Sequence, residues 1–424
     1  MARFVELVGT DDAVEALVAS YERSFSRSDL LSLGLEEELI LLEPDSFEPA
    51  NEIESVLVAA ADPRIVAEFR AAQVELVMPA SPTVSSLRSE LAAARERLVS
   101  ALGGRVRLLA AGAHPSSTLP VEITDRPRYR QIAARHPWVT RRALPSGLHI
   151  HVGLGNAEEA LAVYNAARGY LPELAALAAN SPFFEGGDTG LASSRLELVE
   201  DHPRSGIPPA FASWRELAWF VAWGSGGGLF DDPTYLWWDL RLRPDLGTIE
   251  FRVADAQTSL DHSAAIAAVC QCLVAALRLR LRAGERLPAY PSHVVNENRW
   301  RAVRDGIDSD LVDYETGEVE PARTRLARLL LELEPYAEEL GCSHELELAW
   351  PMLVRNGARR QREVAATRGI DGLLGWLVEE TEQGGRRPAS GGVLEALGDS
   401  EQQFVLRAAV DEERDVVEDR RLTA

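Results

Sequence analysis

Three short segments of the chain place charged side chains at alternating positions of an apolar, strand-like pattern. They are 34–40 (Gly-Leu-Glu-Glu-Glu-Leu-Ile), 146–153 (Ser-Gly-Leu-His-Ile-His-Val-Gly) and 247–253 (Gly-Thr-Ile-Glu-Phe-Arg-Val). Alternate side chains of a strand share one face, so Glu36 and Glu38 lie side by side. Two adjacent carboxylates repel each other unless a cation lies between them. The first segment therefore predicts a metal site on a sheet rather than a solvated surface.

The other two segments add imidazole and guanidinium groups to such a face. His149 alternates with His151, and Glu250 alternates with Arg252. Each pair also has a structural interpretation, because histidines in strands are often hydrogen-bonded core residues and Glu250 could form a cross-strand ion pair with Arg241. Taken together, the three segments favour a face that binds both a metal and an anion.

The residue between the two glutamates of the first segment points the other way. Glu37 shares its face with Leu33, Leu35, Leu39 and Leu41. A carboxylate in apolar surroundings is costly unless it is paired. The pattern therefore predicts that this second face packs on helices, and that Glu37 needs a partner there.

Composition limits the function classes that are open to the chain. Its 424 residues carry a formal net charge of −22, which argues against nucleic acid or an anionic membrane as partner. All 44 basic side chains are arginine, so a P-loop lysine and Schiff-base chemistry are excluded. The three cysteines show neither zinc spacing nor a disulfide framework, and we expect no signal peptide and no apolar run of transmembrane length. We therefore expect a cytoplasmic protein.

Periodicity predicts alternating strands and helices in the first two thirds of the chain and mostly helices after it. The expected elements are a helix over 10–26, strands over 31–42, 72–77, 106–111 and 147–153, helices over 85–102 and 157–179, a long loop over 185–213, a hairpin of 237–243 with 248–254, and helices from 264 to 380 with breaks near 288–291 and 308–321. We expect a single catalytic domain over 1–424, with a sheet core at about 30–285, a helical part at about 290–398 and a charged tail at 399–424.

Many short motifs occur in an order that resembles one known family. They are Gly34–Glu38, Gln73–Leu76, Gly112–Pro115, Ser146–Val152, Leu171-Pro172, Ser181–Phe183, Asp188–Gly190 with Ser194-Arg195, Trp237–Arg241, Gly247–Val253 and Glu297–Arg304. The chain resembles the type-2 glutamate–cysteine ligases, also called YbdK-type carboxylate–amine ligases, from about Leu33 to about Trp376. This resemblance implies an α+β fold with a curved antiparallel β-sheet flanked by helices, like that of glutamine synthetase and the guanidino kinases.

The resemblance also implies a reaction and a set of site residues. The reaction joins the γ-carboxylate of glutamate to an amine such as cysteine, through an acyl phosphate made from ATP with Mg²⁺ or Mn²⁺. The implied metal ligands are Glu36, Glu38, Glu75, His149 and Glu250. The implied catalytic arginines are Arg195, Arg241 and Arg252, and the implied substrate-binding residues are His151, Asn298 and Arg304.

Two functions from other classes stay open at this point. One is a metal-dependent hydrolase that uses His149 and His151, although zinc sites favour nitrogen and sulfur ligands and carboxylates outnumber imidazoles here. The other is a catalytically silent binding protein on the same fold. For the ligase we expect small-molecule partners and a possible homo-oligomer, with no nucleic acid and no membrane.

Overall fold

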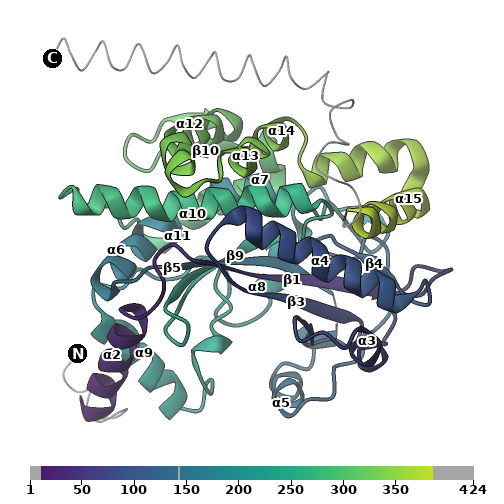
Figure 1. The fold of residues 1–424 in the computed structure, drawn as a ribbon, viewed down its shortest axis with the longest axis horizontal. Helices are drawn as coiled ribbons and strands as arrows, with labels where there is room; N and C mark the ends of the chain where they lie inside the picture. Colours follow the sequence, from purple (N-terminus) through teal and green to yellow (C-terminus); the bar gives the residue numbers. More distant parts are fainter. Residues whose placement is uncertain (1–10, 142–143, 385–424) are drawn as a thin grey trace.

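An antiparallel sheet forms the centre of the protein (Figure 1). The computed structural model describes residues 11–141 and 144–384, and within them this sheet has seven strands in the order β2-β3-β1-β5-β9-β8, with β4 paired to the end of β1. The strands are β1 Leu33–Leu42, β2 Ile65–Ala67, β3 Gln73–Ser81, β4 Arg107–Leu109, β5 Gly147–Gly153, β8 Leu240–Arg243 and β9 Thr248–Asp255. The α+β fold with a helix-flanked antiparallel sheet is thereby confirmed.

One face of the sheet is covered by helices. Helices α4 (Val84–Leu102) and α10 (Leu260–Arg282) lie across it, and α7 (Leu171–Ala178) packs on β9 (Figure 1). The sequence sets the bounds of α4, because Thr83 accepts a hydrogen bond from the Ser86 N–H at the start and Gly103 ends the helix with φ 57°. Leucines 33, 35, 39 and 41 of β1 are buried against this layer, so the predicted apolar face is the helix-packed one.

Helix α10 is the longest helix of that layer. It has 23 residues and is long and apolar enough to cross a membrane, which differs from the sequence-based expectation that no run reaches that length. However, 78% of its apolar window is buried inside the protein, where it contacts α4, α6 (Ala157–Ala167), α12 (Ala322–Leu340) and α13 (Ser343–Glu347). Its composition is therefore explained by its place as the central helix of the layer.

The remaining helices surround this two-layer centre. They are α2 Asp11–Phe25, α3 Ile53–Ala60, α5 Pro127–Arg135, α6 Ala157–Ala167, α8 Ser194–Glu200, α9 Trp214–Gly226, α11 Ser292–Asp305, α12 Ala322–Leu340, α13 Ser343–Glu347, α14 Ala349–Val354 and α15 Gly357–Gln383. Two small hairpins complete the fold, β6 Phe183–Phe184 with β7 Gly187–Asp188 and β10 Asp310–Val312 with β11 Val319–Pro321.

Most predicted elements are present within a few residues of their expected bounds. However, α5 and α9 were not predicted, and the helix expected over 157–179 is divided into α6 and α7 by a 3₁₀ turn. Two further segments differ. The segment 185–213, expected to be a loop, contains α8, whose seven residues are too few for a clear helical period. Strand β2 was also missed, because three residues cannot show alternation. The division into a sheet core and a helical part stays a prediction, and the charged tail at 399–424 lies outside the described residues.

Candidate active site

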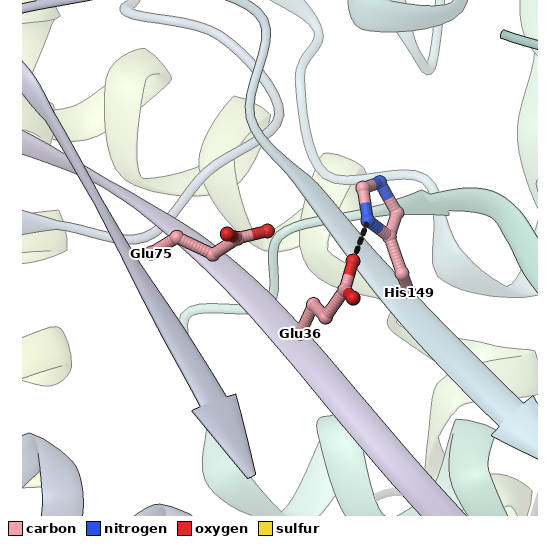
Figure 2. A group of neighbouring side chains, drawn as sticks. All are labelled: Glu36, Glu75 and His149. Carbon is pink, nitrogen blue, oxygen red and sulfur yellow. Dashed lines mark hydrogen bonds and ion pairs between the residues drawn. The ribbon is translucent and has the colours of Figure 1, made fainter. Parts of the chain in front are cut away.

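The uncovered face of the sheet carries the charged side chains that the alternation predicts. Glu38 of β1 lies opposite Glu75 of β3, and Glu36 lies opposite His149 of β5. Figure 2 shows Glu75 and His149 extending from the two flanking strands on either side of Glu36. Ligand atoms of Glu36, Glu75 and His149 all lie within 4.8 Å of one another. The strand register therefore places carboxylates and an imidazole on one face.

Both predicted histidines are buried and orient one ring nitrogen toward this face. His149 Nδ1 lies 3.1 Å from Glu36 Oε2, and His151 Nδ1 lies 3.0 Å from Thr248 Oγ1. The Nε2 atoms of both rings are buried without a hydrogen-bond partner among the described residues. His151 Nε2 lies 3.4 Å from Glu36 and 3.9 Å from Glu250. When Nδ1 holds the proton, each Nε2 presents a lone pair that is suited to a cation.

A group of carboxylates extends the face toward β2. Glu38, Glu68 and Glu75 bring oxygen atoms within 4.8 Å of one another. Burial and the nearby charge of Glu38 raise the pKa of Glu68 to about 7, and burial together with Glu68 and Glu36 raises the pKa of Glu75 well above its usual range. These carboxylates resist simultaneous ionisation, so a divalent cation among them would remove an existing repulsion.

Glu68 is a residue of this group that the sequence analysis missed. It follows directly after β2, and the alternation of Val66, Glu68 and Arg70 was too short to be recognised as part of the sheet. Its pairing with the predicted Glu75 depends on β2 lying beside β3, where Val66 is opposite Glu75. In the sequence, the only indication of Glu68 was a charged residue between the apolar residues Ala67 and Phe69.

Glu250 lies among guanidinium groups. Arg241 binds both of its carboxylate oxygens, Nε to Oε2 at 2.7 Å and Nη2 to Oε1 at 2.9 Å, and Arg252 Nη1 binds Oε1 at 2.5 Å. Burial opposes ionisation of Glu250, but Arg241 and Arg252 outweigh it and hold its pKa well below the usual range. Arg241 also donates to the carbonyls of Thr234 and Leu236, so its donors are largely engaged.

Arg195 differs from Arg241 because most of its donors are free. It lies near the start of α8 and is 4% exposed, yet only Nη2 has a hydrogen bond, to the carbonyl of Arg252 at 3.1 Å. Its Nε and Nη1 have no hydrogen-bond partner among the described residues, and Asp255 approaches Nη1 only to 3.9 Å. Gly147 permits this position, since a Cβ there would lie 2.2 Å from Arg195 Nη2. Arg195 therefore presents unused donors beside the carboxylate face.

Some of these side chains line one cavity of about 340 Å³, namely Glu38, Glu68, His149, Arg195, Arg241 and Arg252. The sheet contributes Glu38, His149 and Arg252 to its lining. Four further residues, which we call the aromatic wall, come from connecting segments and α5: Phe69, Tyr129, His202 and Trp237. Phe69 and Tyr129 meet edge to face, as do His202 and Trp237. The cavity thus combines a charged sheet face with a wall that can contact apolar or planar groups.

Two predicted substrate-binding residues lie elsewhere. Asn298 on α11 bonds the backbone N–H and carbonyl of Val312 at 2.8 and 2.7 Å. Arg304, near the end of α11, binds the neighbouring Asp305 and lines a separate surface hollow. The structure brings neither of them to the carboxylate face, whereas His151 is placed on it.

Comparison with known proteins decides the family. The model of glutamate–cysteine ligase family 2 matches residues 32–389. The chain belongs to this family. A relative from Rubrobacter xylanophilus, provisionally named glutamate–cysteine ligase 2-3, is 39% identical over 369 residues, which are 85% of this chain and 99% of the relative. A relative from Mycobacterium ulcerans, with a similarly provisional name, is 36% identical over 362 residues, 84% of this chain and 91% of that one.

Solved structures agree on the fold. The crystal structure of a glutamate–cysteine ligase from Francisella tularensis in complex with AMP has a TM-score of 0.60 at 12% identity, covering 91% of this chain and 95% of that one. A bifunctional glutathione synthetase from Pasteurella multocida has a TM-score of 0.58 at 15% identity, covering 88% of this chain and 55% of that one. The family membership makes the chain a ligase of the carboxylate–amine class.

Proposed function

We propose that this ligase uses ATP to join the γ-carboxylate of glutamate to an amine such as cysteine, through a γ-glutamyl phosphate. The observation that carries the proposal is the convergence of opposite charges in one cavity. Carboxylates that resist full ionisation lie beside arginines with free donors, on a sheet face that also carries two unpaired imidazole nitrogens. Phosphoryl transfer between two anions needs such an arrangement of cations and arginines around a triphosphate.

The donor set fits Mg²⁺ or Mn²⁺. Glu36, Glu38, Glu68 and Glu75 supply the oxygen ligands that such ions prefer, with His149 Nε2 as a nitrogen ligand for Mn²⁺. The predicted ligand Glu250 differs from the other carboxylates because three arginines already surround it. It can bind a metal only together with Glu36 and His151. When bound, the metal supplies neutralisation of phosphate charge.

The arginines have distinct parts in this proposal. Arg195 directs free N–H groups at the cavity, and Arg252 lies 3.4 Å from His149 while it binds Glu250. Both are suited to hold phosphate oxygens or the reacting carboxylate. Arg241 acts through Glu250, since its own donors are engaged, and we assign it the role of a positioning residue.

The proposed reaction conserves atoms in two steps. A carboxylate oxygen of glutamate bonds to the γ-phosphorus of ATP, and ADP leaves. The amine nitrogen then bonds to the carbonyl carbon, the C–O bond to phosphate breaks, and the amine gives up a proton. Inorganic phosphate therefore retains one oxygen that came from glutamate. The aromatic wall limits the access of water to the acyl phosphate.

The hydrolase alternative predicts different requirements. A zinc hydrolase would use His149 and His151 without nucleotide, but carboxylates outnumber imidazoles in the candidate metal groups. The test is ADP release with every combination of ATP, Mg²⁺ or Mn²⁺, glutamate and a panel of amines. We expect ADP and amide in equal amounts only when all components are present. Product formed equally well without ATP would overturn the proposal in favour of the hydrolase, and ATP turnover that is absent under every condition would favour the silent binding protein.

A further inference from the structure

Arg70 is a buried arginine that the proposed reaction does not use. It lies between β2 and β3, is 5% exposed, and lines the same cavity as Arg195 and Arg252. Its Nε is buried without a hydrogen-bond partner, and its guanidinium makes no ion pair or hydrogen bond within residues 11–141 and 144–384. Its Cζ lies 5.3 Å from the ring centroid of Phe69. Burying the Nε N–H without an oxygen acceptor is expensive, and the ring of Phe69 supplies none, so the position favours a ligand that accepts hydrogen bonds from this guanidinium.

Other buried arginines show what a structural arginine looks like in this protein. Arg95 binds both carboxylate oxygens of Glu37, and Arg168 donates to two backbone carbonyls and to Ser292. Arg299 binds Asp239 and Glu200. Each has its donors matched by oxygens of the protein itself. Arg70 lacks such a match, which separates a binding role from a purely structural one.

The surroundings of Arg70 favour an anion. Glu38 and Glu68 influence its pKa through their charge, but neither is close enough to form an ion pair with it. Burial and the charge of Arg70 together lower the pKa of His202, on the aromatic wall, to about 4, so that this histidine is neutral at pH 7. A chain with a net charge of −22 thus contains a buried guanidinium that no carboxylate of the described residues contacts directly.

We propose that Arg70 binds the non-reacting carboxylate of an amino-acid substrate at the aromatic wall of the cavity. This inference rests on the proposed function, because it assigns a place to a substrate of that reaction. A planar guanidinium matches a carboxylate with two parallel hydrogen bonds, whereas an adenine ring on the aromatic wall would need no cation. The carboxylate has two possible sources, the α-carboxylate of glutamate and the carboxylate of an amino-acid amine such as cysteine.

The experiment compares substrates with and without that carboxylate. Arg70→Met and Arg70→Lys are assayed with glutamate against 4-aminobutyrate as the acid, and with cysteine against cysteamine as the amine. Arg64→Met is the matched control, since Arg64 begins the same part of the sheet but is already paired with Asp62 and Glu90. Arg70→Met should lower kcat/KM by roughly 10- to 100-fold for the substrate that carries the carboxylate and leave its decarboxylated analogue unchanged. Arg70→Lys, which keeps the charge, should recover part of the loss.

The two arms identify the source. A selective loss with glutamate assigns the α-carboxylate of the acid, and a selective loss with cysteine assigns the carboxylate of the amine. Equal losses for both members of each pair, or an altered Mg²⁺ requirement alone, would overturn the inference and make Arg70 a counter-charge for Glu68. Calorimetric binding of glutamate and of cysteine without ATP keeps this test separate from the proposed function. Binding of one of them that weakens in Arg70→Met supports the inference even if no ligation occurs, and unchanged binding of both contradicts it.

Discussion

Arg95 of α4 holds both carboxylate oxygens of Glu37 of β1, Nε to Oε2 and Nη2 to Oε1, each at 2.7 Å. Both side chains are buried, at 1% and 0% exposure. Arg95 also donates to the carbonyls of Gln257 and Thr258, just before α10, and Ser263 of α10 donates to Glu37. This ion pair therefore links strand β1 to helices α4 and α10. It also holds Glu37 on the helix-packed face, so that Glu36 and Glu38 lie on the face of the site.

Replacing Glu37 should reduce stability rather than chemistry. Glu37→Gln leaves the buried Arg95 without its charge partner, which should lower the free energy of unfolding by about 3–5 kcal/mol. Urea unfolding measures this loss, and turnover per folded molecule should stay near that of the parent. Glu38→Gln is the matched control, one residue along on the opposite face, and should show the reverse pattern. If Glu37→Gln abolished metal dependence at unchanged stability, the assigned faces of β1 would be wrong.

Replacing Glu36 should affect metal binding directly. Glu36 contacts both histidines and belongs to two of the candidate metal groups, so Glu36→Gln should reduce turnover by roughly 100-fold or more. Burial opposes ionisation of Glu36, but its hydrogen bonds with His149 and His151 outweigh it and hold its pKa well below the usual range. The amide removes this stabilising charge, so the metal-free variant should melt somewhat lower than the parent. Thermal melts with and without Mg²⁺ test this, because the parent should gain stability with the ion and the variant should gain much less. An identical Mg²⁺ response in both proteins would exclude Glu36 as a ligand.

The alternation of charged residues was sufficient to predict the face of the site. A strand period of two fixes that Glu36 and Glu38 oppose Glu37, and the structure confirms it. The partner of Glu37 could not be predicted, because Arg95 lies 58 residues away on a helix and only tertiary packing brings the two together. Glu68 was missed for a related reason. The three-residue strand β2 before it can be recognised as part of the sheet only from its pairing with β3.

Whether the hydrogen-bond donors of each arginine are free or engaged could not be predicted from the sequence either. Arg195 and Arg241 carry the same side chain and were assigned the same role. The structure shows free donors on Arg195 and engaged donors on Arg241, a difference that arises from loop carbonyls near Thr234 and Leu236. Arg70 was not selected at all, because its significance is a missing partner, which no linear pattern records.

Arg252 should require its planar fork as well as its charge. Arg252→Lys keeps the cation but loses the bond to Glu250 or the contact with substrate. The lost charged hydrogen bond should raise the activation free energy by roughly 1.5–3 kcal/mol and so lower turnover. The melting temperature should fall less, since Arg241 still binds both oxygens of Glu250. Steady-state kinetics beside a thermal melt separate the two effects. Kinetics like those of the parent would reduce Arg252 to a structural partner of Glu250.

Acid should destabilise the protein partly through His202. Burial and the nearby Arg70 lower its folded-state pKa to about 4, whereas an unfolded histidine titrates near 6.5. Between these values the unfolded chain binds a proton that the folded one does not, so stability is lost as pH falls from about 6.5 to about 4. Partial exposure to solvent limits the contribution to about 1–3 kcal/mol. His202→Gln should therefore lose less stability than the parent over this range in urea titrations, and parallel pH profiles would contradict the assignment.

The transfer of oxygen from glutamate to phosphate tests the central claim most directly. Glutamate labelled with ¹⁸O in its γ-carboxylate is converted with ATP, Mg²⁺ and an amine, and the released phosphate is analysed by mass spectrometry. If the cavity activates the carboxylate as an acyl phosphate, one ¹⁸O atom appears in each phosphate that is formed together with amide. Phosphate without ¹⁸O would contradict the account, because its fourth oxygen would then come from water and ATP would be hydrolysed without activation of the acid.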